Sequence, residues 1–349
     1  MSKRQEVFAA LGLYRCKDMV KLMMDNTFSL KSKVIRERIH QETGIPIYRL
    51  LLSLLYCTVR FHVEMEEYLF FSLYRLNTFG RKSYLYYREM EKLRDRLNKH
   101  EYRHIFQKKG IFNQTFAAFI KREWLYTPGK TDEEILAFIQ KEETVFIKPA
   151  GNMKGRGAFK LSFTTIEDPV AFCESARENQ YLIEEVILQH PAIAAVNPHS
   201  VNTVRINSVV DQMGNTVILN AIFRCAADVN IVDNFSQGGI ITTVDLNTGL
   251  LQSNSILGEY AERCLKHPLT GLVLPGIQIP YWEEALQLVR EASQVVPQIR
   301  LVGWDVAFTE QGPLLIEGNH LSGIRTMQYG GTGLRRFLYA VAELGSIDK

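Results

Sequence analysis

The sequence lacks the features that identify several common protein classes. It has five cysteines among 349 residues and no CxxC pair, so we expect reduced thiols in a cytoplasmic protein rather than a disulfide framework. The formal net charge is only +3, which by itself does not indicate a nucleic-acid-binding protein. Low-complexity tracts are absent, and 46% hydrophobic with 23% charged residues is typical of a soluble globular chain.

Long apolar runs are also missing. The N-terminal stretch MSKRQEVFAALGLYRCKDMV lacks the uninterrupted apolar core of a signal peptide. The most apolar stretch, LLLSLLYCTV, is bounded by Arg49 and Arg60, and it is about half as long as the roughly 20 residues that a membrane-spanning helix needs. Tyrosines, leucines and arginines alternate in this region, which is compatible with peripheral contact with a membrane.

The chain is too long for one ordinary hydrophobic core, so we expect two or three domains. Residues 5–107 show apolar positions at three- and four-residue spacing, as in MEEYLFFSLYRL, which predicts helices. After about residue 125, helices alternate with strands that read as hairpins, such as TVRINSVV and TVILNAIFRCA around DQMGN. The sequence therefore predicts a helical N-terminal domain followed by an α+β part.

The stretch VFIKPAGNMKGRGAFKL places glycines and cations between two predicted strands. It fits neither GxxxxGK[ST] nor GxGxxG, because both of these motifs open a helix and the segment after Gly157 suits a strand. Glycines let backbone N–H groups approach phosphate oxygens, and Lys148 and Lys154 could neutralise the phosphate charge. The alternative is a mobile surface turn with solvated cations.

A second polar pattern lies in the predicted hairpin GWDVAFTEQGPLLIEGNH. With its turn at residues 310–312, alternation places Asp305 opposite Glu317 and puts Asn319 on the same face. The same register pairs Thr309 with Pro313 and Ala307 with Leu315. Two carboxylates and an amide oxygen are hard ligands that suit Mg²⁺. A solvated polar face is the alternative, although the flanking strands are too apolar for an outer face.

Two arginines stand inside apolar strands, Arg205 in NTVRINSVV and Arg224 in LNAIFRCA. A buried arginine needs an anionic partner. That partner could be a bound phosphate, or the arginines could form a structural ion pair with Asp228 or Asp211.

Residues 100–104 read HEYRH, which fits the H-E-x-x-H pattern of zinc proteases. The surrounding segment, REMEKLRDRLNKHEYRH, is crowded with charge, whereas a catalytic zinc helix must be packed to hold its ligands. A solvated helix face accounts for this segment better than a metalloprotease site does.

In chain order, these pieces are a strand lysine, a glycine loop, a hinge strand, strand arginines, and an Asp paired with Glu-x-Asn. This order resembles the ATP-grasp superfamily. Four stretches resemble, more narrowly, the sugar-transfer-associated ATP-grasp family, which is found with exopolysaccharide biosynthesis. They are SLLYCTVRFHVEMEEYLFFSLYRL, QKKGIFNQTF, HSVNTVRI and GPLLIEGNH. The likeness covers about residues 45–340.

The resemblance implies an ATP-grasp fold, in which two α+β lobes grip ATP, preceded by the helical domain. Residues 1–107 would form the N-terminal domain and residues 108–349 the ATP-grasp domain. Within the latter, residues 108–186 would form the first lobe, with a lid loop and the hinge. Residues 187–349 would form the second lobe, with the metal site.

The resemblance also implies nucleotide-binding residues. Lys148 matches a strand lysine that contacts the α and β phosphates, and Lys109 matches an earlier nucleotide lysine, although Lys108 stands where an aspartate is usual. The hinge strand LIEEVI would bind adenine through the backbone of residues 184–186, but LQHP stands where a ribose-binding acid is expected. The implied nucleotide-binding set is Lys109, Lys148, Gly151, Lys154, Gly155, Gly157, Glu184, Glu185 and Val186.

The same resemblance assigns the charged residues of the second lobe. Arg205 and Arg224 match arginines near the γ-phosphate. Asp305, Glu317 and Asn319 match the ligands of Mg²⁺, of which two ions are expected.

Enzymes of the superfamily mostly join a carboxylate to an amine through an acylphosphate. We therefore expect an ATP- and Mg²⁺-dependent carboxylate–amine ligase in the cytoplasm, acting on an amino acid, a sugar acid or a peptide, without a nucleic-acid partner. One alternative is a kinase with the same ATP site. The other is a non-catalytic nucleotide-binding scaffold whose helical domain docks a glycosyltransferase or a membrane.

Overall fold

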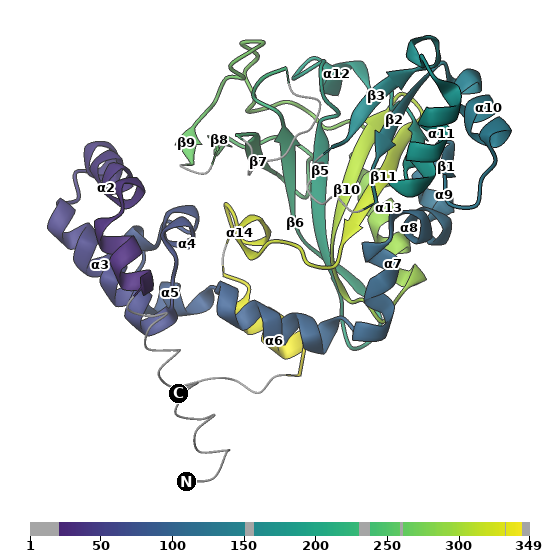
Figure 1. Cartoon of the computed structure of the whole chain (residues 1–349). Coiled ribbons are helices and arrows are strands. Elements are labelled where there is room, and N and C mark those ends of the chain that lie inside the picture. The colour runs from purple at the N-terminus through teal and green to yellow at the C-terminus, as the bar shows by residue number, and fades with distance from the viewer. Residues whose placement is uncertain (1–20, 151–156, 230–237, 259–260, 332, 344–349) are drawn as a thin grey trace, which may run out of the picture. The chain divides into compact units, whose positions relative to one another are not determined.

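The computed structural model describes residues 21–150, 157–229, 238–258, 261–331 and 333–343. The chain divides into two compact units, Met1–Arg94 with Gly323–Lys349, and Asp95–Ser322. Figure 1 labels their elements. The expected class, a mixed α+β chain with a helical N-terminal region, is confirmed. The expected division into folding domains at residues 107 and 108 stays a prediction.

The first unit is helical in its described residues. Its elements are α2 (Leu30–Thr43), α3 (Ile47–Phe61), α4 (Met65–Phe70), η1 (Leu73–Arg75), α5 (Thr78–Ser83), α14 (Ile324–Met327) and α15 (Arg335–Val341), while α6 (Tyr87–Leu97) contains the boundary between the units. Local signals set several helix ends. The Ser29 side chain accepts a hydrogen bond from Ser32 N at the start of α2, and Gly44 ends that helix at φ +72°.

The C-terminal segment packs with the N-terminal helices inside this unit. The buried side chain of Gln328 accepts from Leu85 N (3.0 Å) and donates to Leu85 O (2.9 Å). The Tyr84 hydroxyl donates to Gly331 O (2.9 Å). The backbone N–H and carbonyl of Leu85 and the hydroxyl of Tyr84 thus find partners among residues 328–331. The domain boundaries expected from the sequence did not place these two segments together.

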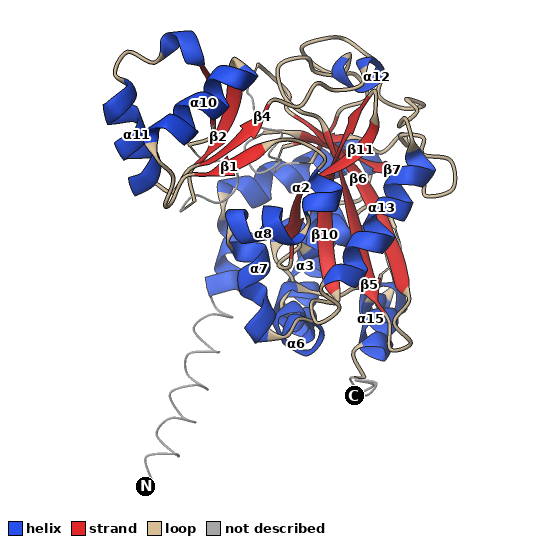
Figure 2. Ribbon diagram, turned by 90° about the vertical axis from the view of Figure 1, so that its right-hand side faces the viewer, coloured by secondary structure: helices blue, strands red, loops and turns tan. Residues whose placement is uncertain are grey.

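The second unit holds two antiparallel sheets. The smaller has the order β1-β4-β2-β3, with β1 (Trp124–Tyr126), β4 (Leu182–Glu185), β2 (Thr144–Lys148) and β3 (Phe159–Ser162). Two helices, α10 (Asp132–Glu142) and α11 (Pro169–Glu178), lie beside it (Figure 2) and share a core with it that includes Ile139, Val145 and Cys173. The strands expected in VFIKP, AFKLSF and YLIEEVI are confirmed as β2, β3 and β4, with the slightly different bounds given above.

The larger sheet has the order β11-β10-β5-β6-β7-β8-β9. Its strands are β5 (Thr203–Val210), β6 (Thr216–Cys225), β7 (Ile240–Val244), β8 (Ile256–Leu257), β9 (Glu262–Arg263), β10 (Leu301–Thr309) and β11 (Gly312–Asn319). The remaining elements of the unit are η2 (His100–Tyr102), α7 (Arg103–Gln107), α8 (Lys109–Thr115), α9 (Ala117–Ile120), η3 (Phe163–Thr165), α12 (Pro191–Ala194) and α13 (Trp282–Val295).

One face of the larger sheet is apolar. Val289 of α13 belongs to the same core as Trp304 of β10. Phe106 and Phe116 pack edge-on against the Trp304 ring, with ring centroids 5.9 and 5.4 Å away. Side chains alternate along a strand, so the residues next to Trp304 point to the opposite face. That face carries the charged residues singled out in the sequence.

The β10–β11 hairpin reaches its expected pairing by an unexpected route. Thr309 pairs with Gly312, so the turn is shorter than predicted and the Thr309–Pro313 and Ala307–Leu315 pairs were wrong. Gly312 adopts φ +111°, a conformation that glycine tolerates and that permits a tight turn. A bulge between Asp305 and Val306 then restores the predicted Asp305–Glu317 pair.

Within the described residues, Cys57, Cys173, Cys225 and Cys264 are free thiols. No helix in these parts of the chain combines the length and the apolar character that crossing a membrane would require.

We expect the substitution Gly318→Ala to destabilise the second unit. A Cβ atom at residue 318 would stand 2.9 Å from ring atoms of Phe106 and Phe112, so the aromatic cluster would have to shift, at a cost of about 1–3 kcal/mol in the free energy of unfolding. Urea unfolding followed by tryptophan fluorescence measures this, because all three tryptophans lie in the second unit.

Met213→Ala is the control, because it lies in the second unit, on which tryptophan fluorescence reports. Met213 is 83% exposed in the β5–β6 turn, so we expect a change within about 0.5 kcal/mol. Equal stability of the two variants would show that the aromatic cluster yields without cost.

Candidate functional site

A buried carboxylate, that of Glu184, organises the polar residues of the smaller sheet. Its strand β4 lies between β1 and β2, and the side chain is only 2% exposed. Glu184 pairs with Lys148 (2.5 Å) and with Arg122, and it accepts a hydrogen bond from Asn113 (3.1 Å). Burial alone would raise its pKa, but the charges of Arg122 and Lys148 lower the pKa of Glu184 to about 2.

Lys109 brings a second lysine to the same place. It opens α8, and its Nζ donates to the carbonyl of Pro149, just after β2. Burial and then the charge of Lys148 lower the pKa of Lys109, while Glu317 and Glu184 raise it. Two lysines from separate elements therefore lie close enough to repel each other, with Glu317 of the larger sheet within electrostatic reach.

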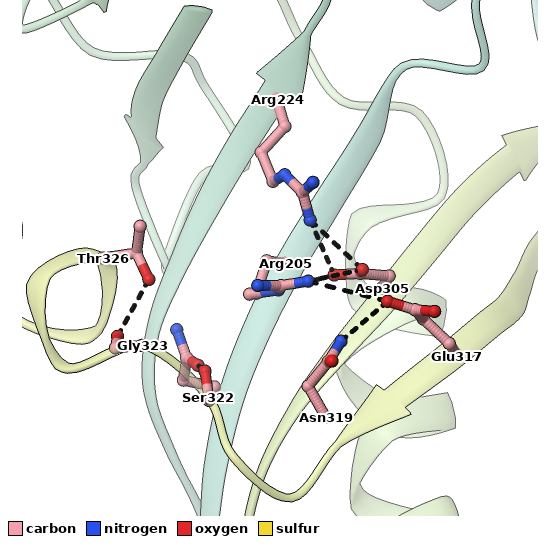
Figure 3. A network of polar contacts seen from close by, with 9 residues as sticks. Arg205, Arg224, Asp305, Glu317, Asn319, Ser322, Gly323 and Thr326 are labelled. Carbon is pink, nitrogen blue, oxygen red and sulfur yellow. Dashed lines mark hydrogen bonds and ion pairs between the residues drawn. The ribbon is translucent and has the colours of Figure 1, made fainter. Parts of the chain in front are cut away.

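The second buried carboxylate is Asp305 on β10, which is 5% exposed. Its neighbours across the sheet are Arg205 on β5 and Glu317 on β11. Figure 3 shows Arg205 and Arg224, from adjacent strands, both directed at Asp305. Arg205 donates to both carboxylate oxygens (2.7 and 2.6 Å), and Arg224 Nη1 lies 3.3 and 3.1 Å from them.

The structure thus supplies an anionic partner for both arginines that the sequence did not suggest. Asp305 was expected as a metal ligand, and Asp228 and Asp211 were the aspartates considered for an ion pair. The Asp211 carboxylate instead accepts from the backbone of Met213 and Asn215 in its own turn.

Asp305 and Glu317 titrate in opposite directions. Although burial opposes it, the charges of Arg205 and Arg224 lower the pKa of Asp305 to about 2. The Glu317 side chain is 51% exposed. Desolvation by the surrounding protein, followed by the negative charge of Asp305, nevertheless raises the pKa of Glu317. Asn319 donates to Glu317 (2.9 Å; Figure 3). Two adjacent carboxylates that repel in this way are suited to share a cation.

The donor set fits Mg²⁺ in chemical type. Asp305, Glu317 and Asn319 offer oxygen ligands on one face of β10 and β11. Over the residues that the structure describes, no group of three or more His, Cys, Asp and Glu side chains could hold a metal ion. A metal bound at Asp305, Glu317 and Asn319 would have two carboxylates and an amide as ligands, and it would share Asp305 with the two arginines.

The expected loop and hinge residues are placed only in part. Gly151, Lys154 and Gly155 lie outside the described residues, whereas Gly157 is exposed, with φ +71°, shortly before β3. In the hinge, Glu185 N already donates to Glu123 O (3.0 Å), and Val186 follows the end of β4.

Some residues of the site were not expected from the sequence. Arg122 carries no motif and lies 62 residues from its partner Glu184. Asn113 falls within QKKGIFNQTF, one of the stretches that carried the family resemblance, and this was the available signal.

In the HEYRH segment, His100 lies in η2 and His104 in α7, and His104 Nδ1 contacts Glu101 O (2.7 Å).

Comparison with known proteins adds a family. A family model described as sugar-transfer associated ATP-grasp matches residues 81–343. No curated protein sequence matches the chain. Similar solved structures include the ATP-grasp ligase PsnB complexed with a phosphomimetic variant of its minimal precursor, Mg and ADP. It is 13% identical, with a TM-score of 0.45, and the match covers 72% of this chain and 62% of PsnB.

Two further structures are equally distant. D-alanyl-alanine synthetase A from Vibrio cholerae is 13% identical, with a TM-score of 0.42, over 68% of this chain and 65% of that one. D-cycloserine synthetase DcsG is 12% identical, with a TM-score of 0.42, over 73% and 79%. The matched region spans less than two thirds of the length of PsnB and of D-alanyl-alanine synthetase A.

We expect Glu184→Gln to lower the free energy of unfolding at pH 7 by about 3–5 kcal/mol, because Arg122 and Lys148 lose their buried counter-charge. The folded pKa of Glu184, about 2, lies below the value of about 4.3 in an unfolded chain. The ionised Glu184 therefore contributes its full stabilisation above the unfolded pKa, and this contribution is lost as the pH falls through the folded pKa. Urea unfolding at pH 7, 5, 4 and 3 should show the gap between wild type and variant shrinking.

Glu185→Gln, one residue along the same strand, is the control, since its carboxylate accepts an exposed hydrogen bond from Glu123 N. We expect a loss below about 1 kcal/mol. A gap between wild type and Glu184→Gln that stays constant with pH would contradict the charge-based account.

Proposed function

Because the chain belongs to the sugar-transfer associated ATP-grasp family, we propose that it is an ATP-dependent ligase that joins a carboxylate to an amine through an acylphosphate. The main support is a charge arrangement within one unit. Two acids and two arginines share one face of the larger sheet, and two lysines of the neighbouring elements lie within electrostatic reach of the same Glu317. Such a concentration of cations around two carboxylates suits a metal–polyphosphate ligand.

In this proposal, Lys148 and Lys109 bind the nucleotide phosphates. Glu184 holds Lys148 in place, with Arg122 as the second cation on the same carboxylate. The loop residues Gly151, Lys154, Gly155 and Gly157 cover the phosphates, and the hinge residues Glu184, Glu185 and Val186 lie along the adenine.

Asp305, Glu317 and Asn319 would hold Mg²⁺, proposed as two ions, which would neutralise phosphate charge and so ease the attack of one anion on another. Arg205 and Arg224 orient the γ-phosphate and the acylphosphate derived from it. Arg205 already holds Asp305 through two parallel hydrogen bonds, and the same guanidinium fork fits a phosphate.

The proposed reaction needs no covalent bond to the protein. The substrate carboxylate attacks the γ-phosphorus, ADP leaves, and the amine then displaces inorganic phosphate from the acyl carbon. We propose an amino acid, a sugar acid or a peptide as the substrates, and the cytoplasm as the location.

Hydroxylamine should intercept the acylphosphate. Full-length protein with ATP, Mg²⁺ and pools of carboxylates is assayed for ADP, and mass spectrometry then identifies any hydroxamate. With the correct carboxylate, we expect ADP, inorganic phosphate and a hydroxamate even without an amine. A kinase would leave phosphate on its product and give no hydroxamate, and a binding scaffold would release no ADP.

Glu317→Gln should abolish this turnover, whereas Asp211→Asn, which removes a carboxylate from the β5–β6 turn, should not. Arg205→Lys keeps the charge but loses the fork, so it should slow acylphosphate formation more than it weakens ATP binding. If Glu317→Gln and Arg205→Lys both turned over normally, the proposed site would be wrong.

The arginines also predict how the site takes up metal. Arg205 and a divalent cation would compete for Asp305, so the nucleotide-free protein should bind Mn²⁺ weakly. Arg205→Gln removes the bidentate partner of Asp305 and should raise the Mn²⁺ affinity on the order of tenfold, measured by electron paramagnetic resonance without nucleotide.

Lys130→Gln is the control, because it removes the cation from an exposed ion pair with Glu134 (2.8 Å) in the same unit. It should leave the Mn²⁺ affinity unchanged. An unchanged affinity in Arg205→Gln as well would argue against Asp305 as a metal ligand.

A further inference from the structure

Helix α3 presents apolar side chains to solvent on the face opposite its core. Leu50, Leu54, Cys57 and Thr58 are buried against the rest of the first unit. On the other side, four apolar side chains recur at spacings of four, four and three residues, which places them in one row along the helix. This α3 stripe consists of Tyr48 (59% exposed), Leu52 (62%), Tyr56 (41%) and Val59 (55%).

A surface helix normally turns polar residues to solvent, so a contiguous apolar row marks an interaction site. The row extends into a shallow depression lined by Leu55, Tyr56, Val59, Arg60 and His62. The helix is apolar on both faces, and the described residues of the unit bury only one of them.

Cations border the stripe. Helix α3 contains Arg49 and Arg60, both exposed, and no acidic residue. A third arginine, Arg81 of α5, donates to the Ser53 hydroxyl (2.7 Å) and lies 5.7 Å from the centre of the Tyr56 ring. The surface thus combines leucine and valine, two tyrosines and three arginines.

We propose that the α3 stripe, with Arg49, Arg60 and Arg81, docks the protein on a bilayer that contains anionic lipids. In this orientation α3 lies parallel to the surface. Leu52 and Val59 reach the acyl boundary, the tyrosine rings lie at headgroup depth, and the arginines pair with lipid phosphates. The proposal does not depend on the ligase activity.

The charges favour this occupant over a second copy of the chain. Two copies packed through the stripe would oppose Arg49 to Arg49 if the helices were parallel, and Arg49 to Arg60 if they were antiparallel. Either arrangement brings like charges together in an apolar contact, which is destabilising. An anionic lipid surface instead gains from every arginine.

The test is co-sedimentation of the full chain with phosphatidylcholine vesicles, with and without phosphatidylglycerol. We expect binding that requires phosphatidylglycerol and weakens with salt. Leu52→Glu should weaken the partitioning by at least about tenfold, since it replaces a buried apolar contact with a negative charge. Arg49→Gln and Arg60→Gln should each weaken it by about fivefold.

Met213→Glu is the matched control, because Met213 is 83% exposed in the second unit and the charge change is the same. It should bind like the wild type. If Leu52→Glu proves misfolded by circular dichroism, Tyr56→Ser tests the same row without adding charge, and it should also weaken binding.

Three results would overturn the proposal. The first is failure of the wild type to bind vesicles containing phosphatidylglycerol. The second is equal binding by Leu52→Glu and Met213→Glu. The third is a dimer in sedimentation velocity that dissociates in Leu52→Glu while vesicle binding does not change, which would assign the stripe to a second copy.

Discussion

The compensation of one buried negative charge, on Asp305, explains much of the larger sheet. Asp305 is 5% exposed on a strand with neighbours on both sides, and an uncompensated charge in that position would be strongly destabilising. Arg205 and Arg224 supply the compensation, which accounts for two arginines inside otherwise apolar strands. The bulge beside Asp305 sets Glu317 opposite it, so the second acid lies next to the same compensated charge.

The smaller sheet repeats this arrangement with other residues. Glu184 is buried and holds Arg122 and Lys148, as Asp305 holds Arg205 and Arg224. In each trio one carboxylate positions two cations. Cations fixed in advance by a carboxylate lose little conformational freedom when an anionic ligand arrives, and this suits the proposed binding of a polyphosphate between metal, lysines and arginines.

The notable feature of the first unit is exposed apolar surface rather than buried charge. There the unexplained feature is an apolar row on α3, bordered by arginines, that none of the described residues of the unit buries. The charged clusters of the second unit bear on what reaction the protein performs, and the α3 stripe bears on where it performs it. The two features lie in separate compact units of the chain.

The sequence by itself determined the features that depend on neighbouring residues. Alternation and turn residues predicted the strands around Lys148, Arg205 and Asp305, and the motif order predicted the family, which the match over residues 81–343 confirms. It also gave the Asp305–Glu317 pair, although through a turn one residue too long, because a bulge cannot be recognised from alternation alone.

Only the tertiary structure decided which charges meet. Glu184 and Arg122 are 62 residues apart, and Asp305 and Arg205 are 100 apart; their contacts depend on strand order, which no local pattern encodes. The packing of residues near 330 with Tyr84 and Leu85 has the same origin. Periodicity specifies which side of an element faces a core, whereas the partner found there is set by how distant segments are brought together.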